Sequence, residues 1–255
     1  MIILLSPAKI QHFSDELSYK EYSLPVFLKE AEKLVRRMRS LSAQELARLL
    51  GINRELTRLT LDRYLQWQRP FTPGNARQAA LVFDGEAFRG LQASTFTPDD
   101  FATAQSCLRI LSGLYGVLRP LDLIQPYRLE VSSKLANEAG RDLYPFWTAK
   151  VNKLLRKELK SHRKSPFILN LASTEYFKMT GFKKDDVPVI DVEFYEYKHD
   201  NFRQVVIYTK KARGMMARYV ITRKIDTFDD LKGFDSDGYW YNPNLSSESK
   251  LVFVR

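Results

Sequence analysis

Three serine–lysine pairs in this chain have the S-x-x-K spacing by which a lysine one helical turn away activates a serine nucleophile in acyl-transfer enzymes. The pairs are Ser6/Lys9, Ser161/Lys164 and Ser247/Lys250. The last two lie in polar segments, and no Ser-Asp-Asn or Lys-Thr-Gly sequence accompanies any of the three. We therefore expect no catalytic serine, and we predict that Lys9, which follows the first apolar run, contacts a phosphate.

A second candidate site is a basic segment without any carboxylate between Asn201 and Lys224. Its seven cations are Arg203, Lys210, Lys211, Arg213, Arg218, Arg223 and Lys224. If the segment from Lys210 to Arg223 is helical, four of the cations share an arc of about 160°, opposite a stripe of Met and Tyr. Solvated helices normally mix both signs, so this face is predicted to bind an anion. Gly214, inside this helix, indicates a close approach of a backbone or ligand, or a break in the helix.

The third candidate is the segment Leu108–Glu130, which contains Gly113 and Gly116. Apolar residues at helical spacing from Phe101 to Leu114 predict a helix that runs into these glycines. Glycine permits close approach to an anion, and the free N–H groups that open a following helix attract phosphate. This pattern predicts a helix-hairpin-helix that grips a nucleic-acid backbone. The alternative is an ordinary helix end with glycine after the last turn.

Metal and redox chemistry have weaker signals. The three histidines, His12, His162 and His199, have no partner at ligand spacing, and the calcium-loop fragment Asp235-Ser-Asp-Gly238 lacks the glutamate that should follow. Cys107 lies on the apolar side of its helix and is predicted to be a core residue rather than a redox sensor. We expect no metal and no cofactor. Asn170, Ser173, Glu175 and Lys178 follow a predicted strand and could hold a small ligand, or could form only a local helix contact.

Composition favours a globular protein with a polyanionic partner. The chain has 255 residues, 44% of them hydrophobic, and a formal net charge of +10, which favours nucleic acid over a neutral ligand. A lone cysteine is typical of the reducing cytoplasm. The apolar run at the N-terminus is too short for a signal peptide, and no stretch approaches the roughly 18 apolar residues needed to cross a bilayer.

The predicted elements form one α+β domain over residues 1–255, with a mixed β-sheet flanked by helices. Residues 20–165 are helix-rich and residues 166–255 strand-rich. Helices are expected over 24–40 and 146–164, and after the N-cap sequences Phe71-Thr72-Pro73 and Phe96-Thr97-Pro98. Strands are expected over 167–172, 187–197, 203–209 and 251–254, the middle two joined by a turn at His199–Asn201.

Several blocks spread along the chain together resemble the YaaA-type family of bacterial peroxide stress proteins. They are Ser6-Pro-Ala-Lys9, Asn75-Ala-Arg-Gln-Ala79, Leu108–Glu130, Asn170-Leu-Ala-Ser173 with Glu175-Tyr-Phe-Lys178, Lys210-Lys-Ala-Arg-Gly214 and Gly238-Tyr239. The chain departs from the family pattern at Ile10, where threonine is expected, and at Val131, where methionine is expected. The resemblance implies an undivided α/β body, DNA binding through a helix-hairpin-helix and a positive cleft, and protection from hydrogen peroxide and unincorporated iron.

The leading hypothesis is a cytoplasmic, monomeric, non-enzymatic protein of the peroxide response that binds double-stranded or distorted DNA without sequence specificity. The alternatives are an enzyme that acts on nucleic acid or a phosphorylated small molecule, and an iron-handling protein. The residues expected to contact DNA are Lys9, Arg77, Arg109, Gly113, Tyr115, Gly116, Arg119, Arg128, Lys178, Lys210, Lys211, Arg213 and Arg218.

Overall fold

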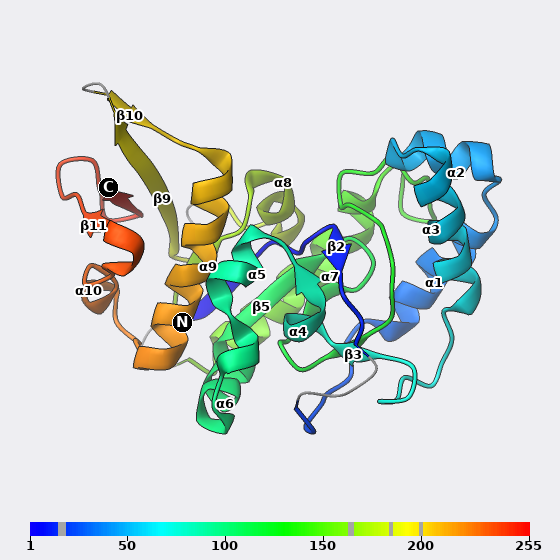
Figure 1. Ribbon diagram of the computed structural model, residues 1–255, viewed down its shortest axis with the longest axis horizontal. Helices are drawn as coiled ribbons and strands as arrows, with labels where there is room; N and C mark the ends of the chain where they lie inside the picture. Colours follow the sequence, from blue (N-terminus) through cyan, green and yellow to red (C-terminus); the bar gives the residue numbers. More distant parts are fainter. Residues whose placement is uncertain (15–18, 163–165, 184–185, 199–200) are drawn as a thin grey trace.

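The first strand, β1 (Ile2–Leu5), runs through the middle of the main sheet because all four of its side chains are apolar and buried. The computed structural model describes residues 1–14, 19–162, 166–183, 186–198 and 201–255. Strand β1 pairs in parallel with β5 (Leu108–Ser112) on one side and with β8 (Ile168–Leu171) on the other. The fold is a compact α+β body in which helices flank a mixed sheet of eight strands (Figure 1).

The sheet has the order β11-β12-β9-β8-β1-β5-β6, with β10 paired to β9. The remaining strands of this sheet are β6 (Gly116–Leu118), β9 (Val189–Lys198), β10 (Asn201–Arg203), β11 (Trp240–Tyr241) and β12 (Lys250–Val254). β6, β10 and β11 are antiparallel to their neighbours and the central strands are parallel. Two small sheets pair β2 (Ile10–Gln11) with β4 (Phe83–Asp84), and β3 (Arg77–Gln78) with β7 (Leu123–Ile124).

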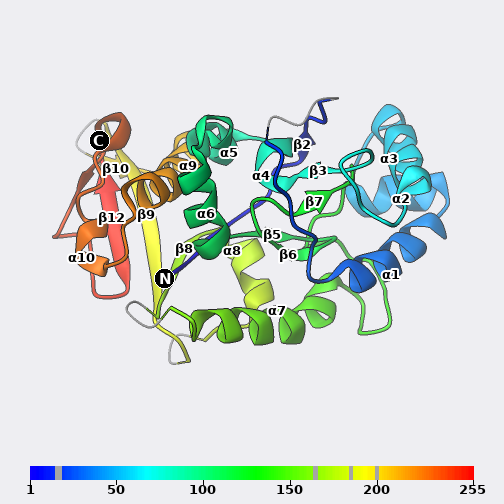
Figure 2. The same ribbon diagram turned by 90° about the horizontal axis from the view of Figure 1, so that it is seen from below.

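Helices cover both faces of the main sheet. Figure 2 shows α7 (Leu143–Leu159) along one face and α5 (Glu86–Leu91), α6 (Pro98–Cys107) and α9 (Val206–Arg223) along the other. The helices α1 (Leu28–Arg39), α2 (Ala43–Leu50) and α3 (Arg54–Gln66) group at one end of the molecule. The short helices are α4 (Ala79–Val82), α8 (Thr174–Phe177), α10 (Phe228–Leu231) and the 3₁₀ turns Ala93–Thr95, Lys178–Thr180 and Ser236–Gly238.

The order of the strands reverses between β1 and β8. From β1 the chain goes to β5 on one side, and it then returns to β8 on the other side, from which β9 and β12 continue outward. In open sheets of this kind, ligands bind outside the carboxyl ends of the strands at the point of reversal. Ser6 directly follows β1 and Ser173 follows β8, so the topology places both serines at this point.

Helices α5 and α9 cross at two glycines. A Cβ at Gly90 would overlap the carbonyl oxygen of Lys211, and a Cβ at Gly214 would overlap that of Ala87. Gly214 is buried inside an unbroken helix, which confirms a close backbone approach at this position. The crossing holds the first half of α9 over the carboxyl ends of β1 and β8 (Figure 1).

The predicted helix-hairpin-helix at Leu108–Glu130 is wrong. Helix α6 ends at Cys107, and Leu108–Ser112 continues as the buried strand β5, which turns into β6 as an antiparallel hairpin. Apolar residues at helical spacing also suit a strand that is buried on both faces. A Cβ at Gly113 would overlap the carbonyl oxygen of Leu129, and Gly116 (φ +71°) leaves room for the ring of Trp147. These glycines therefore serve tight internal packing.

Other local expectations have mixed outcomes. Thr97 is the N-cap of α6 and Pro98 is its first residue, as predicted. The Thr97 hydroxyl accepts a hydrogen bond from the Asp100 amide, and the Asp100 carboxylate accepts one from the Thr97 amide. No helix starts at Thr72, because the Asn75 side chain accepts from the Thr72 amide and donates to the Pro70 carbonyl, which fixes a turn.

Of the predicted strands, some are confirmed and one is wrong. The strands over 167–172, 187–197 and 251–254 are confirmed as β8, β9 and β12. The prediction of a strand over 203–209 is wrong, because β10 ends at Arg203 and α9 begins at Val206. Helix α7 begins at Leu143, where Asp142 caps it, rather than at Phe146. The predicted turn residue His199 and the predicted helix end at Lys164 lie outside the described residues.

Candidate functional site

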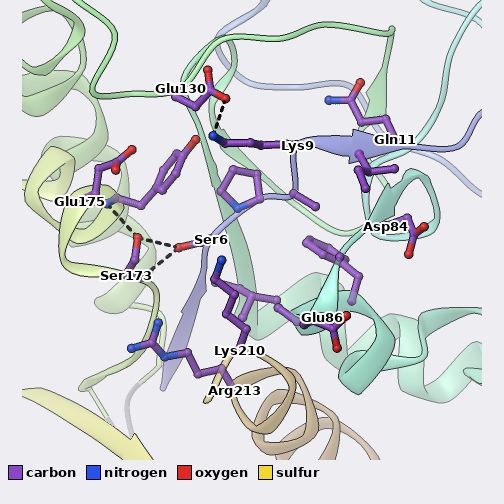
Figure 3. Close-up of a pocket in the computed structure, with 18 of the residues that line it drawn as sticks. Ser6, Lys9, Gln11, Asp84, Glu86, Glu130, Ser173, Glu175, Lys210 and Arg213 are labelled. Atoms are coloured by element: carbon purple, nitrogen blue, oxygen red, sulfur yellow. Dashed lines mark hydrogen bonds and ion pairs between the residues drawn. The ribbon is translucent and has the colours of Figure 1, made fainter. Parts of the chain in front are cut away.

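A cavity of about 640 Å³ opens at the carboxyl ends of β1 and β8, where the strand order reverses (Figure 3). Five segments surround it: the loop after β1, the β4–α5 turn, the segment 127–132, the loop and short helix after β8, and the first half of α9. Its charged lining residues are Lys9, Asp84, Glu86, Arg89, Arg128, Glu130, Glu175, Lys210 and Arg213.

Two serines tie the loops after β1 and β8 together. The Ser6 hydroxyl donates to Ser173 Oγ at 3.3 Å and accepts from the Ser173 backbone N–H at 2.9 Å. Ser173 also caps α8, because its Oγ accepts from the Tyr176 amide. Both serines line the cavity.

Helix α9 supplies two cations to this side of the cavity. Lys210 and Arg213 lie three residues apart and point from α9 toward Ser6 and Ser173 (Figure 3). Lys210 is exposed and has no ion-pair partner among the described residues. Arg213 Nε is buried without a hydrogen-bond partner. Burial lowers the pKa of Arg213, while Asp191 and Glu193 on β9 oppose that shift.

The opposite side of the cavity carries an incompletely satisfied ion cluster. Glu130 Oε1 lies 3.4 Å from Lys9 Nζ and 3.8 Å from Arg128 Nε. Neither Glu130 Oε1 nor Arg128 Nε has a hydrogen-bond partner, although both atoms are buried. Nearby, Ser132 donates to Glu175.

All three buried side-chain atoms that lack a hydrogen bond in the described part of the chain belong to residues that line this one cavity. An unsatisfied buried polar atom costs about 1–3 kcal/mol. Native structures contain few such atoms, and a missing ligand is one explanation for each. Their concentration here marks the cavity as the candidate binding site.

A second hollow of about 630 Å³ adjoins the cavity and shares Lys9, Glu130 and Ser132 with it. It extends toward α1 and α2, where Arg37 and Arg48 line it. We call the two adjoining hollows the groove. Its cations are Lys9, Arg37, Arg48, Arg89, Arg128, Lys134, Lys210 and Arg213, against the five carboxylates Glu45, Asp84, Glu86, Glu130 and Glu175.

Four of the thirteen residues predicted to contact DNA line the cavity: Lys9, Arg128, Lys210 and Arg213. The other cations of that set bind within the protein. Arg109 is buried, pairs with Glu158 at 2.8 Å and donates to three carbonyls of α6 and β5. Arg119 pairs with the buried Asp122, and Arg218 donates to the carbonyls of Leu91 and Gln92.

The remaining predicted residues also lie outside the cavity. Arg77 donates to backbone carbonyls, Lys178 lies over the ring of Tyr144, and Lys211 lies 3.5 Å from Asp237. Gly113, Tyr115 and Gly116 are buried, and Tyr115 OH is bonded to Trp67 and Gln125. The backbone of this hairpin is therefore closed to a nucleic acid.

Sequence reasoning missed Glu130, Arg37 and Arg48 as site residues. The helix α2, which carries Arg48, has a local sequence signal. Ser42 and Glu45 form a capping box at its start, and Gly51 and Asn53 follow its end. Glu130 had none, because its partners Lys9 and Arg128 meet it only in the folded chain.

The described residues contain no group of three or more His, Cys, Asp or Glu side chains arranged to hold a metal ion. Cys107 is buried, as predicted, and burial raises the pKa of its thiol to about 11. Across the described ranges, no helix combines the length and apolar character that a membrane span requires.

Comparisons with known proteins agree with the resemblance of the sequence blocks. A family model described as "Peroxide stress protein YaaA" matches residues 1–245. A UPF0246 protein of Dechloromonas aromatica (strain RCB) is 42% identical over 255 residues, which cover 100% of this chain and 99% of that protein. The family supports a role in the response to peroxide. Because both similarities span nearly the entire chain, this protein belongs to the YaaA family of peroxide stress proteins.

Proposed function

We propose that the protein serves the peroxide response by binding DNA through the phosphate backbone, with the groove as the contact surface. The observation that carries this proposal is the lining of the groove, in which eight cations face five carboxylates. The cations come from segments far apart in the sequence, so the fold gathers them on one surface. Lys210, Arg48 and Lys134 have no ion-pair partner among the described residues, which leaves them available to phosphates.

The turn between α2 and α3 borders the far end of the groove and supports the same proposal. Gly51 adopts a left-handed conformation (φ 60°), and a Cβ built there would meet nothing within 4 Å. The turn is open to solvent, unlike the buried β5–β6 hairpin, and the first N–H groups of α3 follow it. Such N–H groups attract phosphate. This pair of helices is our candidate for the helix-hairpin-helix that the family resemblance implies.

Contacts of this kind position a protein on DNA without reading its sequence. We therefore expect similar affinities for unrelated duplexes. A protein bound along the backbone would shield that stretch of DNA from oxidants generated by peroxide and iron, which is the protective role that we assign to binding.

The test compares two double variants with the same loss of charge. Lys210→Gln with Arg48→Gln removes one cation from each end of the groove, whereas Lys29→Gln with Arg223→Gln removes two exposed cations outside it. Fluorescence anisotropy with a random-sequence duplex should show about a tenfold loss of affinity, or about 1.4 kcal/mol, for the groove variant. The affinity of the control variant for the same duplex should fall less than about threefold. Equal losses in both variants would contradict a contact surface in the groove.

A further inference from the structure

The cavity at the carboxyl ends of β1 and β8 has two chemically different ends. On one side, Lys210 and Arg213 face the hydroxyls of Ser6 and Ser173 (Figure 3). Lys210, Arg213 with its unpartnered Nε, and the one hydroxyl hydrogen that the Ser6–Ser173 bond leaves free form a set of donors that matches the oxygens of a phosphate. This end is suited to the anionic part of a ligand.

On the other side, a buried donor and a buried acceptor lie next to each other. Arg128 Nε and Glu130 Oε1 lie 3.8 Å apart and neither makes a hydrogen bond, although Lys9 Nζ forms an ion pair with Glu130 Oε1 at 3.4 Å. A ligand edge that carries both a donor and an acceptor would satisfy the pair. Nucleobase edges have this pattern, with an amine or imine N–H beside a ring nitrogen or carbonyl oxygen.

The cavity also has apolar lining residues. They include Pro7, Ala8, Phe88, Leu171 and Tyr176, and burial keeps Tyr176 in its neutral form by raising the pKa of its hydroxyl. Apolar lining suits a flat heterocycle better than a sugar with many hydroxyls, because each sugar hydroxyl would lose its hydrogen bonds to water there.

We propose that this cavity binds a single nucleotide, with its phosphate at Lys210, Arg213 and the two serines and its base at Arg128 and Glu130. The volume of about 640 Å³ lies within the range of small-ligand sites, about 300–1,000 Å³, and excludes a duplex. The nucleotide comes either from solution as a free monophosphate or from a DNA strand, extruded out of its stack. The second source rests on the proposed DNA binding, whereas the first does not.

The primary experiment is calorimetric titration of the full-length protein with each of the four deoxynucleoside monophosphates and with inorganic phosphate. At least one nucleotide should bind about tenfold more tightly than phosphate, because the base contributes at the Arg128–Glu130 end. Lys210→Gln and Arg213→Gln should each weaken both probes by about tenfold. Glu130→Gln should weaken binding of the nucleotide without weakening that of phosphate, because the substitution removes a negative charge from the cavity. Arg223→Gln, on the same helix but outside the cavity, is the matched control.

A second arm separates the two sources. A duplex with one bulged nucleotide presents a base that is already unpaired, so an extruded nucleotide predicts tighter binding to it than to the fully paired duplex. Glu130→Gln should abolish this preference and keep the affinity for paired DNA. Nucleotide binding without a preference for the bulge would assign the cavity to free nucleotides.

Two negative results have different meanings. If no nucleotide binds more tightly than phosphate and the bulge gives no preference, the inference is wrong even when paired DNA binds. If nucleotides bind but paired DNA does not, the proposed function is wrong and the nucleotide cavity stands. Lys210 is exposed, so we expect the Lys210→Gln variant to fold. If Arg213→Gln or Glu130→Gln is unstable, the titration of Lys210→Gln still tests the inference.

Discussion

Individual arginines and lysines in this protein have different roles that depend on burial. Arg109 is enclosed by carbonyl oxygens and Glu158, whereas Lys210 stands exposed at the mouth of the cavity. Both are basic residues in blocks shared with the family, and no local pattern distinguishes them. The distinction arises from the strand β5, which takes Arg109 into the interior.

Replacing Arg109 by alanine should therefore destabilise the fold and leave DNA binding intact. The change leaves Glu158 without its partner and three carbonyls without a donor, so we expect a loss of about 2–4 kcal/mol in the free energy of unfolding. Urea denaturation measures this loss, and anisotropy measures the affinity of the folded protein.

Lys210→Ala is the matched control and should show the reverse. Its free energy of unfolding should change by less than about 0.5 kcal/mol, and its affinity for DNA should fall. A stable Arg109→Ala variant with weakened DNA binding would restore Arg109 to the contact surface.

Cys107 should react slowly in the native protein. Burial raises the pKa of its thiol to about 11 from the ordinary 9.0, so the thiolate fraction near neutral pH falls about 100-fold. Alkylation by iodoacetamide should be slower by at least this factor in the folded protein than in urea. Similar rates in both states would show an accessible thiol and revive the hypothesis of a redox sensor.

At the scale of elements, the crossing of α5 and α9 positions the cationic end of the cavity. Gly214→Ala improves helix propensity by about 1 kcal/mol, but the new methyl group would overlap the Ala87 carbonyl oxygen. Because backbone must move to relieve this overlap, we expect a net loss of about 2–4 kcal/mol in the free energy of unfolding.

The control for this prediction is Gly74→Ala, where the nearest atom to the new Cβ is Thr72 Oγ1 at 3.5 Å. Its free energy of unfolding should stay within about 0.5 kcal/mol of that of the original protein. Thermal or urea unfolding of both variants measures the difference. An unchanged stability in Gly214→Ala would show that the two helices are not held at this distance.

Elements with local signals were predictable and those set by long-range contacts were not. The capping sequence at Thr97 is local, and the helix expected over Lys210–Arg223 is confirmed within α9. Of the four cations predicted to share one face of this helix, only Lys210 and Arg213 line the cavity. The segment after Cys107 has apolar residues that suit either a helix or a buried strand. Only its parallel pairing with β1 decides between them, and that contact joins residues over 100 positions apart.

At the scale of the whole molecule, the site depends on the order of the strands. Ser6 and Ser173 are 167 residues apart in sequence and hydrogen-bonded in the fold, because β1 and β8 are neighbours. The sequence predicted a mixed sheet with flanking helices and named Ser6, Lys9, Ser173 and Glu175 as chemically interesting. It could not predict the strand order, and hence neither the reversal point nor the meeting of Glu130 with Lys9.

In the same fold, the groove continues from the cavity at the carboxyl ends of β1 and β8 to the second hollow, near the α2–α3 turn. A surface of this kind acts as a unit, since each cation along it neutralises one phosphate and releases condensed counterions. We propose that the groove binds the DNA backbone electrostatically.

The most direct test of that claim is a salt titration of binding to a random-sequence duplex. If four to six phosphates are neutralised, log K should fall against log[salt] with a slope of about −4 to −5. In Lys210→Gln with Arg48→Gln the slope should become shallower by about 2, one for each cation removed. An affinity that does not change with salt, or a slope that the double substitution leaves unaltered, would contradict backbone binding in the groove.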